Sequence, residues 1–111
     1  MRKRTVAVLL AVTAAAIVAL PVFAATPKFS GTVGPGFTIS MKKPTKAGRT
    51  TVVVSDKSSI HNFHLKGPNV NVKTTVPFSG SKTFTVTLKK GKYTFLCDPH
   101  PTSMKGSFTI K

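Results

Sequence analysis

The sequence predicts an all-β domain, a sandwich or barrel of about seven or eight short strands. Three observations support this prediction. Short runs rich in Val, Thr and Phe recur along the chain, and clusters of Gly, Pro, Asn and Lys separate one run from the next. After residue 24, no stretch shows the apolar periodicity of an amphipathic helix.

The strands recur at a spacing that is typical of an antiparallel sandwich or barrel. In chain order they are expected at 37–41, 50–55, 61–65, 70–76, 83–88, 93–97 and 107–110. Turns are expected where turn-forming residues gather between these segments, at 34–36, 46–48, 67–69, 79–80 and 89–92. The chain shows no internal repeat and no long linker, so one domain is predicted.

Strand alternation also predicts which polar side chains face the core, because successive residues of a strand point to opposite faces. In the strand expected at 93–97, Cys97 ends a row of core-facing aromatic residues. In the strand expected at 61–65, His61 lies on the apolar face, whereas His64 points the other way and is expected to face solvent.

The N-terminus has the three parts of a secretory signal. Basic residues at 2–4 precede an apolar run at 6–20, and small residues then lead to a cleavage point after Ala24. The predicted domains are a signal peptide at 1–24 and one domain at 25–111, and the protein is expected to be exported. An uncleaved membrane anchor is the alternative, but the run is short for a spanning helix.

The chain is strongly basic, with 17 Lys and Arg against 2 Asp and Glu. Removing the predicted signal leaves a net charge of about +12. Such a charge suits an anionic partner, either an acidic protein or a polyanionic envelope, and export argues against nucleic acid. The alternative is that the basic surface serves only solubility.

The single cysteine is the most informative residue of the chain. A lone cysteine in an exported protein cannot form an internal disulfide, so it is buried and inert, paired with another chain, or coordinated. Cys97 stands close to His100 and Met104, and His61 faces inward from another strand. Any of these residues alone would be a core or loop residue, but together they are the donor set of a blue-copper site. Zinc is the competing ion, although it seldom takes a methionine.

Two segments resemble the cupredoxins, the plastocyanin, pseudoazurin and amicyanin-like proteins. "GKYTFLCDPHPTSMKGSFTI" (91–110) resembles their C-terminal hairpin, and "SSIHNFHL" (58–65) resembles the strand that supplies their first histidine ligand. The resemblance runs from about residue 32 to residue 111. The ligand loop, Cys-x-x-His-x-x-x-Met, is one residue shorter than in plastocyanin-like sites and one longer than in amicyanin-like sites.

The resemblance implies an eight-stranded Greek-key β-sandwich with one type 1 copper per chain. The implied ligands are His61 Nδ1, Cys97 Sγ, His100 Nδ1 and Met104 Sδ. Asn62 is implied to hold the ligand loops together and to donate its backbone N–H to the sulfur.

The expected function is that of an exported, monomeric electron carrier that cycles between Cu(I) and Cu(II). Copper storage, buffering or delivery by the same fold is the alternative. An enzyme with Cys97 as nucleophile is disfavoured, because no carboxylate is evident to orient a histidine base. An acidic redox partner is expected to meet the protein at the edge of His100, with Lys105 beside the ligand loop.

Overall fold

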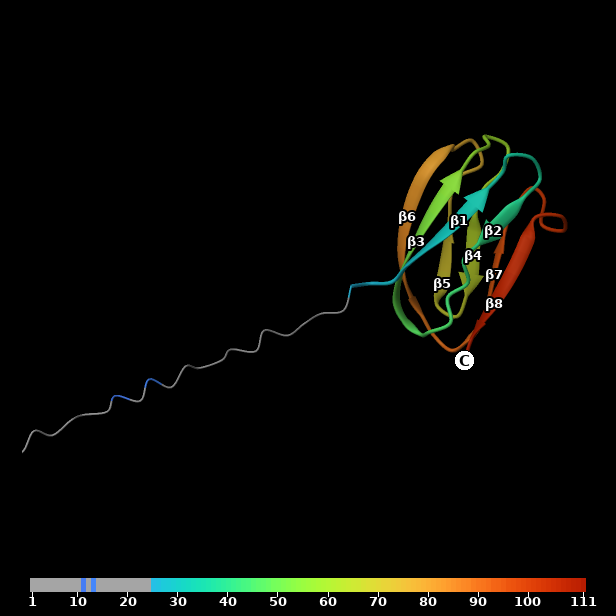
Figure 1. Ribbon diagram of the computed structural model, residues 1–111. Helices are drawn as coiled ribbons and strands as arrows, with labels where there is room; N and C mark the ends of the chain where they lie inside the picture. Colours follow the sequence, from blue (N-terminus) through green and yellow to red (C-terminus); the bar gives the residue numbers. More distant parts are fainter. Residues whose placement is uncertain (1–10, 12, 14–24) are drawn as a thin grey trace, which may run out of the picture.

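The computed structural model describes residue 11, residue 13 and residues 25–111, so the predicted signal peptide lies almost entirely outside the described part. The described residues form eight strands and no helix (Figure 1). Among them there is therefore no helix that is long and apolar enough to cross a membrane. The strands are β1 (Lys28–Val33), β2 (Ile39–Met41), β3 (Gly48–Asp56), β4 (His64–Gly67), β5 (Val70–Lys73), β6 (Gly80–Leu88), β7 (Gly91–Leu96) and β8 (Lys105–Ile110).

Two four-stranded sheets face each other, in the orders β2-β1-β3-β6 and β5-β4-β7-β8. The predicted all-β sandwich is confirmed. The expectation of purely antiparallel neighbours is wrong in one place, because β1 and β3 pair in parallel, with Lys28 opposite Thr51. The hairpin of β1 and β2 occupies one side of β1, and β3 then enters on the other side in the same direction as β1.

β1 is absent from the strands predicted from sequence, because a glycine interrupts its apolar pattern. Gly31 is buried, and a Cβ at this position would lie 3.0 Å from Cε2 of Phe63, so a larger inward-facing side chain would crowd that ring. Two other predicted strands begin too early. β2 starts only at Ile39, and β4 starts only at His64, so His61 precedes its strand rather than lying within it.

The core lies between the sheets and follows the predicted alternation in β6 and β7. Four aromatic rings stack in two pairs inside it, Phe63 on Phe95 with centroids 5.9 Å apart and Tyr93 on Phe108 at 5.2 Å. Glycines make room for these rings. A Cβ on Gly67 or on Gly106 would overlap the ring of Tyr93 or of Phe95, respectively.

The connections after β1, β3, β5 and β7 gather at the end of the sandwich opposite the C-terminus (Figure 1). Backbone hydrogen bonds join some of these connections; the N–H of Thr74, after β5, donates to the carbonyl of Phe63 at 2.9 Å. All of the predicted copper ligands lie at this end. The fold therefore brings residues that are distant in sequence into one group of loops.

Candidate metal centre

Three of the predicted ligands meet at this end of the sandwich. His61 comes from the connection between β3 and β4, Cys97 follows β7, and His100 lies in the loop that leads to β8. The two Nδ1 atoms are 3.1 Å apart, and Cys97 Sγ lies 3.7 Å from His61 Nδ1 and 3.6 Å from His100 Nδ1. Cys97 and His61 are buried, whereas His100 is half-buried. His100 thus gives the cluster its contact with solvent.

The triangle of donor atoms has the size that a metal ion requires. A point equidistant from the three atoms lies about 2.0 Å from each, close to a metal–nitrogen bond of about 2.0–2.1 Å and a metal–thiolate bond of about 2.3 Å. The donors are two imidazole nitrogens and one sulfur, the set found in blue-copper sites. The residues present therefore fit a copper ion.

The loop from Cys97 to Met104 is closed by a ring of three backbone hydrogen bonds. The N–H of His100 donates to the carbonyl of Cys97 at 3.1 Å, and the N–H of Met104 donates to the carbonyl of His100 at 3.0 Å. The N–H of Cys97 completes the ring by donating to the carbonyl of Met104 at 3.0 Å. These bonds thus hold the backbone at three predicted ligands in a fixed arrangement.

Met104, the predicted axial ligand, is fully buried and belongs to this ring. Its ligation, like the assignment of each ligand atom, stays a prediction. Asn62 joins the ligand loops. Its Nδ2 donates to the carbonyl of Thr74 at 3.1 Å and to Oδ2 of Asp98 at 2.8 Å, and its Oδ1 accepts from the N–H of Asp98 at 2.8 Å. The implied donation from the backbone of Asn62 to the sulfur stays a prediction.

The expectation that His64 faces solvent is wrong. Its side chain points away from the core, as the alternation in β4 predicts, yet the residue is only 8% exposed. Two polar side chains cover it. His64 Nδ1 donates to Oδ1 of Asp98 at 2.8 Å, and its Nε2 lies 2.6 Å from Oδ1 of Asn71. Asp98, which directly follows Cys97, thus links the ligand loop to β4.

Sequence reasoning missed the role of Asp98, although one signal was present, since it is one of only two acids in the chain. Partial burial alone would raise the pKa of Asp98, but hydrogen bonds with His64 and Asn62 favour the carboxylate and lower that pKa. The other acid, Asp56, behaves in the opposite way. Its burial raises its pKa, and its Oδ2 has no hydrogen-bond partner among the described residues.

Phe37 covers the two histidines from the solvent side. Its ring meets the imidazole of His61 edge-on at a centroid distance of 5.1 Å and that of His100 at 5.0 Å. The residue itself is 59% exposed, and Ile60 beside His61 is 56% exposed. These two exposed apolar side chains, here called the apolar edge, lie at the same end of the sandwich as the half-buried imidazole of His100.

A two-sheet sandwich with a His-Cys-His cluster at one end defines a copper-binding protein of the cupredoxin class. The chain matches the family described as copper binding proteins, plastocyanin/azurin family, over residues 31–111, and it belongs to this family. Together with the donor set, this makes it a protein with one type 1 copper site.

Solved structures of blue-copper proteins share the fold. Reduced rusticyanin, determined by NMR, is 26% identical, with 76% of each chain covered and a TM-score of 0.52. Auracyanin A, a "blue" copper protein from Chloroflexus aurantiacus, is 18% identical, with 78% of this chain and 100% of that one covered and a TM-score of 0.53. Dithionite-reduced auracyanin from Roseiflexus castenholzii is 20% identical over 80% and 99%, with a TM-score of 0.50. No curated protein sequence matches the chain.

Proposed function

We propose that this protein is a one-electron carrier rather than an enzyme. The observation that carries the proposal is the arrangement of the donors: Cys97 and His61 are sealed in the core, and only His100 is half-buried. Such a cluster has no open approach for a substrate, but one imidazole edge lies where a redox partner could reach it. Bound copper would supply a Cu(I)/Cu(II) couple at this position.

The chain's own residues would keep the site unchanged between the two oxidation states. The backbone ring from Cys97 to Met104 and the side chain of Asn62 hold the backbone of the ligand loop through bonds that do not involve the ion. The ring of Phe37 covers one side of the two imidazoles and limits the approach of water there. A rigid, dry donor set needs little rearrangement when an electron arrives or leaves, and this is what a carrier requires.

The apolar edge of Phe37 and Ile60 suits a transient contact with a redox protein. Exposed apolar and aromatic side chains form the centre of protein interfaces, and a weak redox encounter needs only a small area. The excess of basic residues favours an acidic partner through long-range attraction. His100 is the proposed point of electron transfer, and Lys105 stays a candidate for the rim of the contact.

We also propose that the protein acts outside the cytoplasm. The support is the sequence of residues 1–24, which has the basic, apolar and small-residue parts of a signal peptide. N-terminal sequencing of the exported protein tests this. A first residue of Ala25 is expected, and an intact N-terminus in the membrane fraction would favour the anchored alternative.

The electron-carrier proposal is tested by loading the purified protein with Cu(II) and recording its visible spectrum through repeated reduction and oxidation. We expect one copper per chain, a blue colour from charge transfer by the thiolate, and full recovery of the colour in each cycle. Cys97→Ser should abolish the colour, whereas Ser103→Ala, an exposed change in the same loop, should keep it. Copper that binds but cannot be cycled would instead indicate storage or delivery.

A further inference from the structure

The outer faces of the two sheets differ in the number of basic residues that they carry. On the outer face of the β5-β4-β7-β8 sheet, the alternation of burial and the strand register place four exposed lysines, here called the lysine face: Lys66, Lys73, Lys92 and Lys105. From strand spacing and rise, these lysines span about 14 Å across the strands and about 13 Å along them. Four of the 14 basic residues that follow residue 24 therefore share one broad surface.

The opposite sheet shows the contrast. The outward positions of its three longer strands, β1, β3 and β6, are mainly serines and threonines, and their cross-strand pairs include Thr51 with Thr85 and Ser55 with Ser81. Its charged outward residues, Lys28 and Arg49, lie at one end, and Lys82 is exposed on its edge strand β6. The outer face of the β5-β4-β7-β8 sheet is therefore the more basic of the two outer faces.

Only one carboxylate approaches the lysine face. Of the two acids, Asp56 is buried, and Asp98 lies at the edge of the face, where it is bonded to His64 and interacts with the charge of Lys73. The bond with His64 is the only salt bridge within residues 25–111. The ammonium groups of Lys66, Lys92 and Lys105 are therefore free to meet anions from outside.

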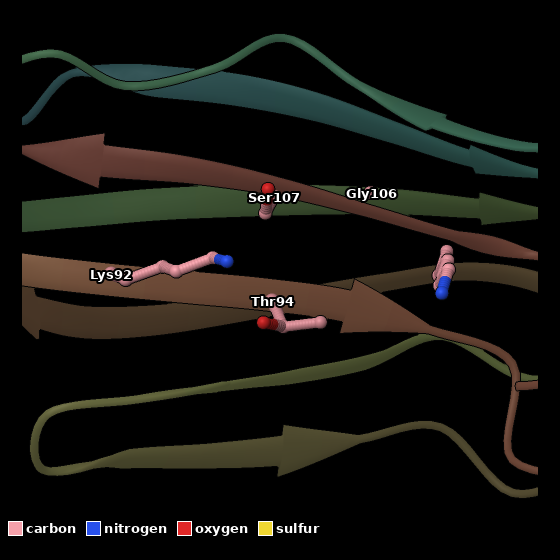
Figure 2. A pocket seen from close by; sticks show the side chains of 5 residues that line it. Lys92, Thr94, Gly106 and Ser107 are labelled. Carbon is pink, nitrogen blue, oxygen red and sulfur yellow. The ribbon is translucent and has the colours of Figure 1, made fainter.

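The lysine face contains a hollow with the donors that an oxyanion requires. It has a volume of about 400 Å³ and is lined by Lys92, Thr94, Lys105, Gly106 and Ser107. Figure 2 shows Lys92 extending over the sheet, with the hydroxyls of Thr94 and Ser107 on either side of its nitrogen end. Ammonium and hydroxyl groups both donate hydrogen bonds, and a phosphate group offers several charged acceptor oxygens to receive them.

The residue types of the lysine face favour a polyanion over a protein as its partner. Protein interfaces are centred on apolar and aromatic side chains, but Leu96 is the only large apolar residue at an outward position of these strands, and it is half-buried. Burial of apolar side chains would also be needed to hold the face firmly in a membrane surface. Charge complementarity without apolar anchors instead fits an extended polymer that carries phosphate groups.

We propose that the lysine face binds a phosphate-bearing polyanionic polymer. This surface is the side of the sandwich and reaches the ligand loop only at Lys105, whereas His100 and the apolar edge of Phe37 lie at the end, so polymer binding leaves the imidazole edge of His100 accessible. The inference goes beyond electron transfer and does not depend on it, because binding to a polymer is measured without any redox reaction.

The test uses inorganic polyphosphate as the probe and the copper-loaded protein, with binding measured by calorimetry across a salt series. One variant carries glutamine at all four positions of the lysine face. The matched control carries glutamine at four exposed lysines that flank the other sheet, so it loses the same charge: Lys28, Lys42, Lys43 and Lys46. Circular dichroism and the visible spectrum verify that both variants fold.

We expect the lysine-face variant to bind polyphosphate about 200-fold more weakly at 0.15 M salt, with a salt slope lower by about 3, because each lost contact releases one counterion fewer. The control should lose much less. Equal losses in the two variants would show diffuse charge and overturn the proposal. Equal affinity for poly-glutamate, or tighter binding to vesicles of anionic phospholipid, would overturn the choice of a phosphate polymer.

A second measurement tests where the polymer lies. Reduction of the copper-loaded protein by a neutral hydroquinone should proceed at the same rate with and without saturating polyphosphate. A blocked reaction would place the polymer over the copper end and overturn the assignment to the lysine face.

Discussion

Replacing Asp98 with asparagine tests how the ligand loop is held against the sheet. The change keeps the shape of the side chain but removes the negative charge from its bonds with His64 and Asn62. A hydrogen bond to a charged group contributes about 1.5–3 kcal/mol. Because the side chain of Asp98 is 37% exposed, solvent screening weakens this contribution, and we expect a loss of about 1–2 kcal/mol in the free energy of unfolding at pH 7.

The stability lost in Asp98→Asn should be greatest at neutral pH and should vanish in acid. Because folding lowers the pKa of Asp98, its carboxylate stabilises the fold fully above the ordinary pKa of the unfolded chain, about 3.9. That stabilisation disappears as the pH falls through the lower pKa of the folded state. Urea unfolding of the metal-free protein, followed by circular dichroism, should therefore show wild type and Asp98→Asn apart at pH 7 and converging in acid.

Asp56→Asn provides a control, because the change in stability that we expect from it has the opposite sign. Burial raises its pKa in the fold, so its ionised form destabilises the protein as the pH rises above about 3.9. We expect Asp56→Asn to increase the free energy of unfolding at pH 7 and to have little effect in acid. If Asp98→Asn costs nothing at neutral pH, or if its cost persists in acid, the account of the loop anchor is wrong.

Two further changes test the core and the cover of the site. Gly106→Ala should lower the free energy of unfolding by about 1–3 kcal/mol, because the new methyl group overlaps the ring of Phe95, and the control Ser107→Ala should change it by less than about 0.5 kcal/mol. Urea titration measures both, and a neutral Gly106→Ala would show that the ring can move aside. Phe37→Ala should lower the reduction potential, since water reaching His100 favours the more highly charged oxidised site. A redox titration measures this, and an unchanged potential would show that the ring does not shield the imidazoles.

Much of the fold could be predicted because its strands alternate regularly. In β7, Tyr93 and Phe95 occupy successive inward positions, and Cys97 continues this row directly after the strand, so local sequence alone places the thiol in the core. β1 could not be predicted in this way. The residue at its centre is Gly31, because the ring of Phe63 leaves little room there for a larger side chain. Phe63 comes from a segment far along the chain.

The same distinction applies to the candidate site. The Cys-x-x-His-x-x-x-Met loop is a local pattern, so the sequence alone is enough to propose its ligands. The burial of His64 depends instead on Asp98, which is distant in sequence and reaches it only through the fold. Alternation predicted correctly that His64 points outward, but it could not predict that the ligand loop would cover it.

The ring of backbone hydrogen bonds through Cys97, His100 and Met104 has a consequence for how the protein matures. The ring consists of main-chain atoms, so its formation belongs to the folding of the polypeptide and not to the arrival of copper. This differs from small zinc domains, in which the metal itself drives folding. We therefore expect the chain to fold before it binds copper, and copper to enter a loop whose backbone is already in place.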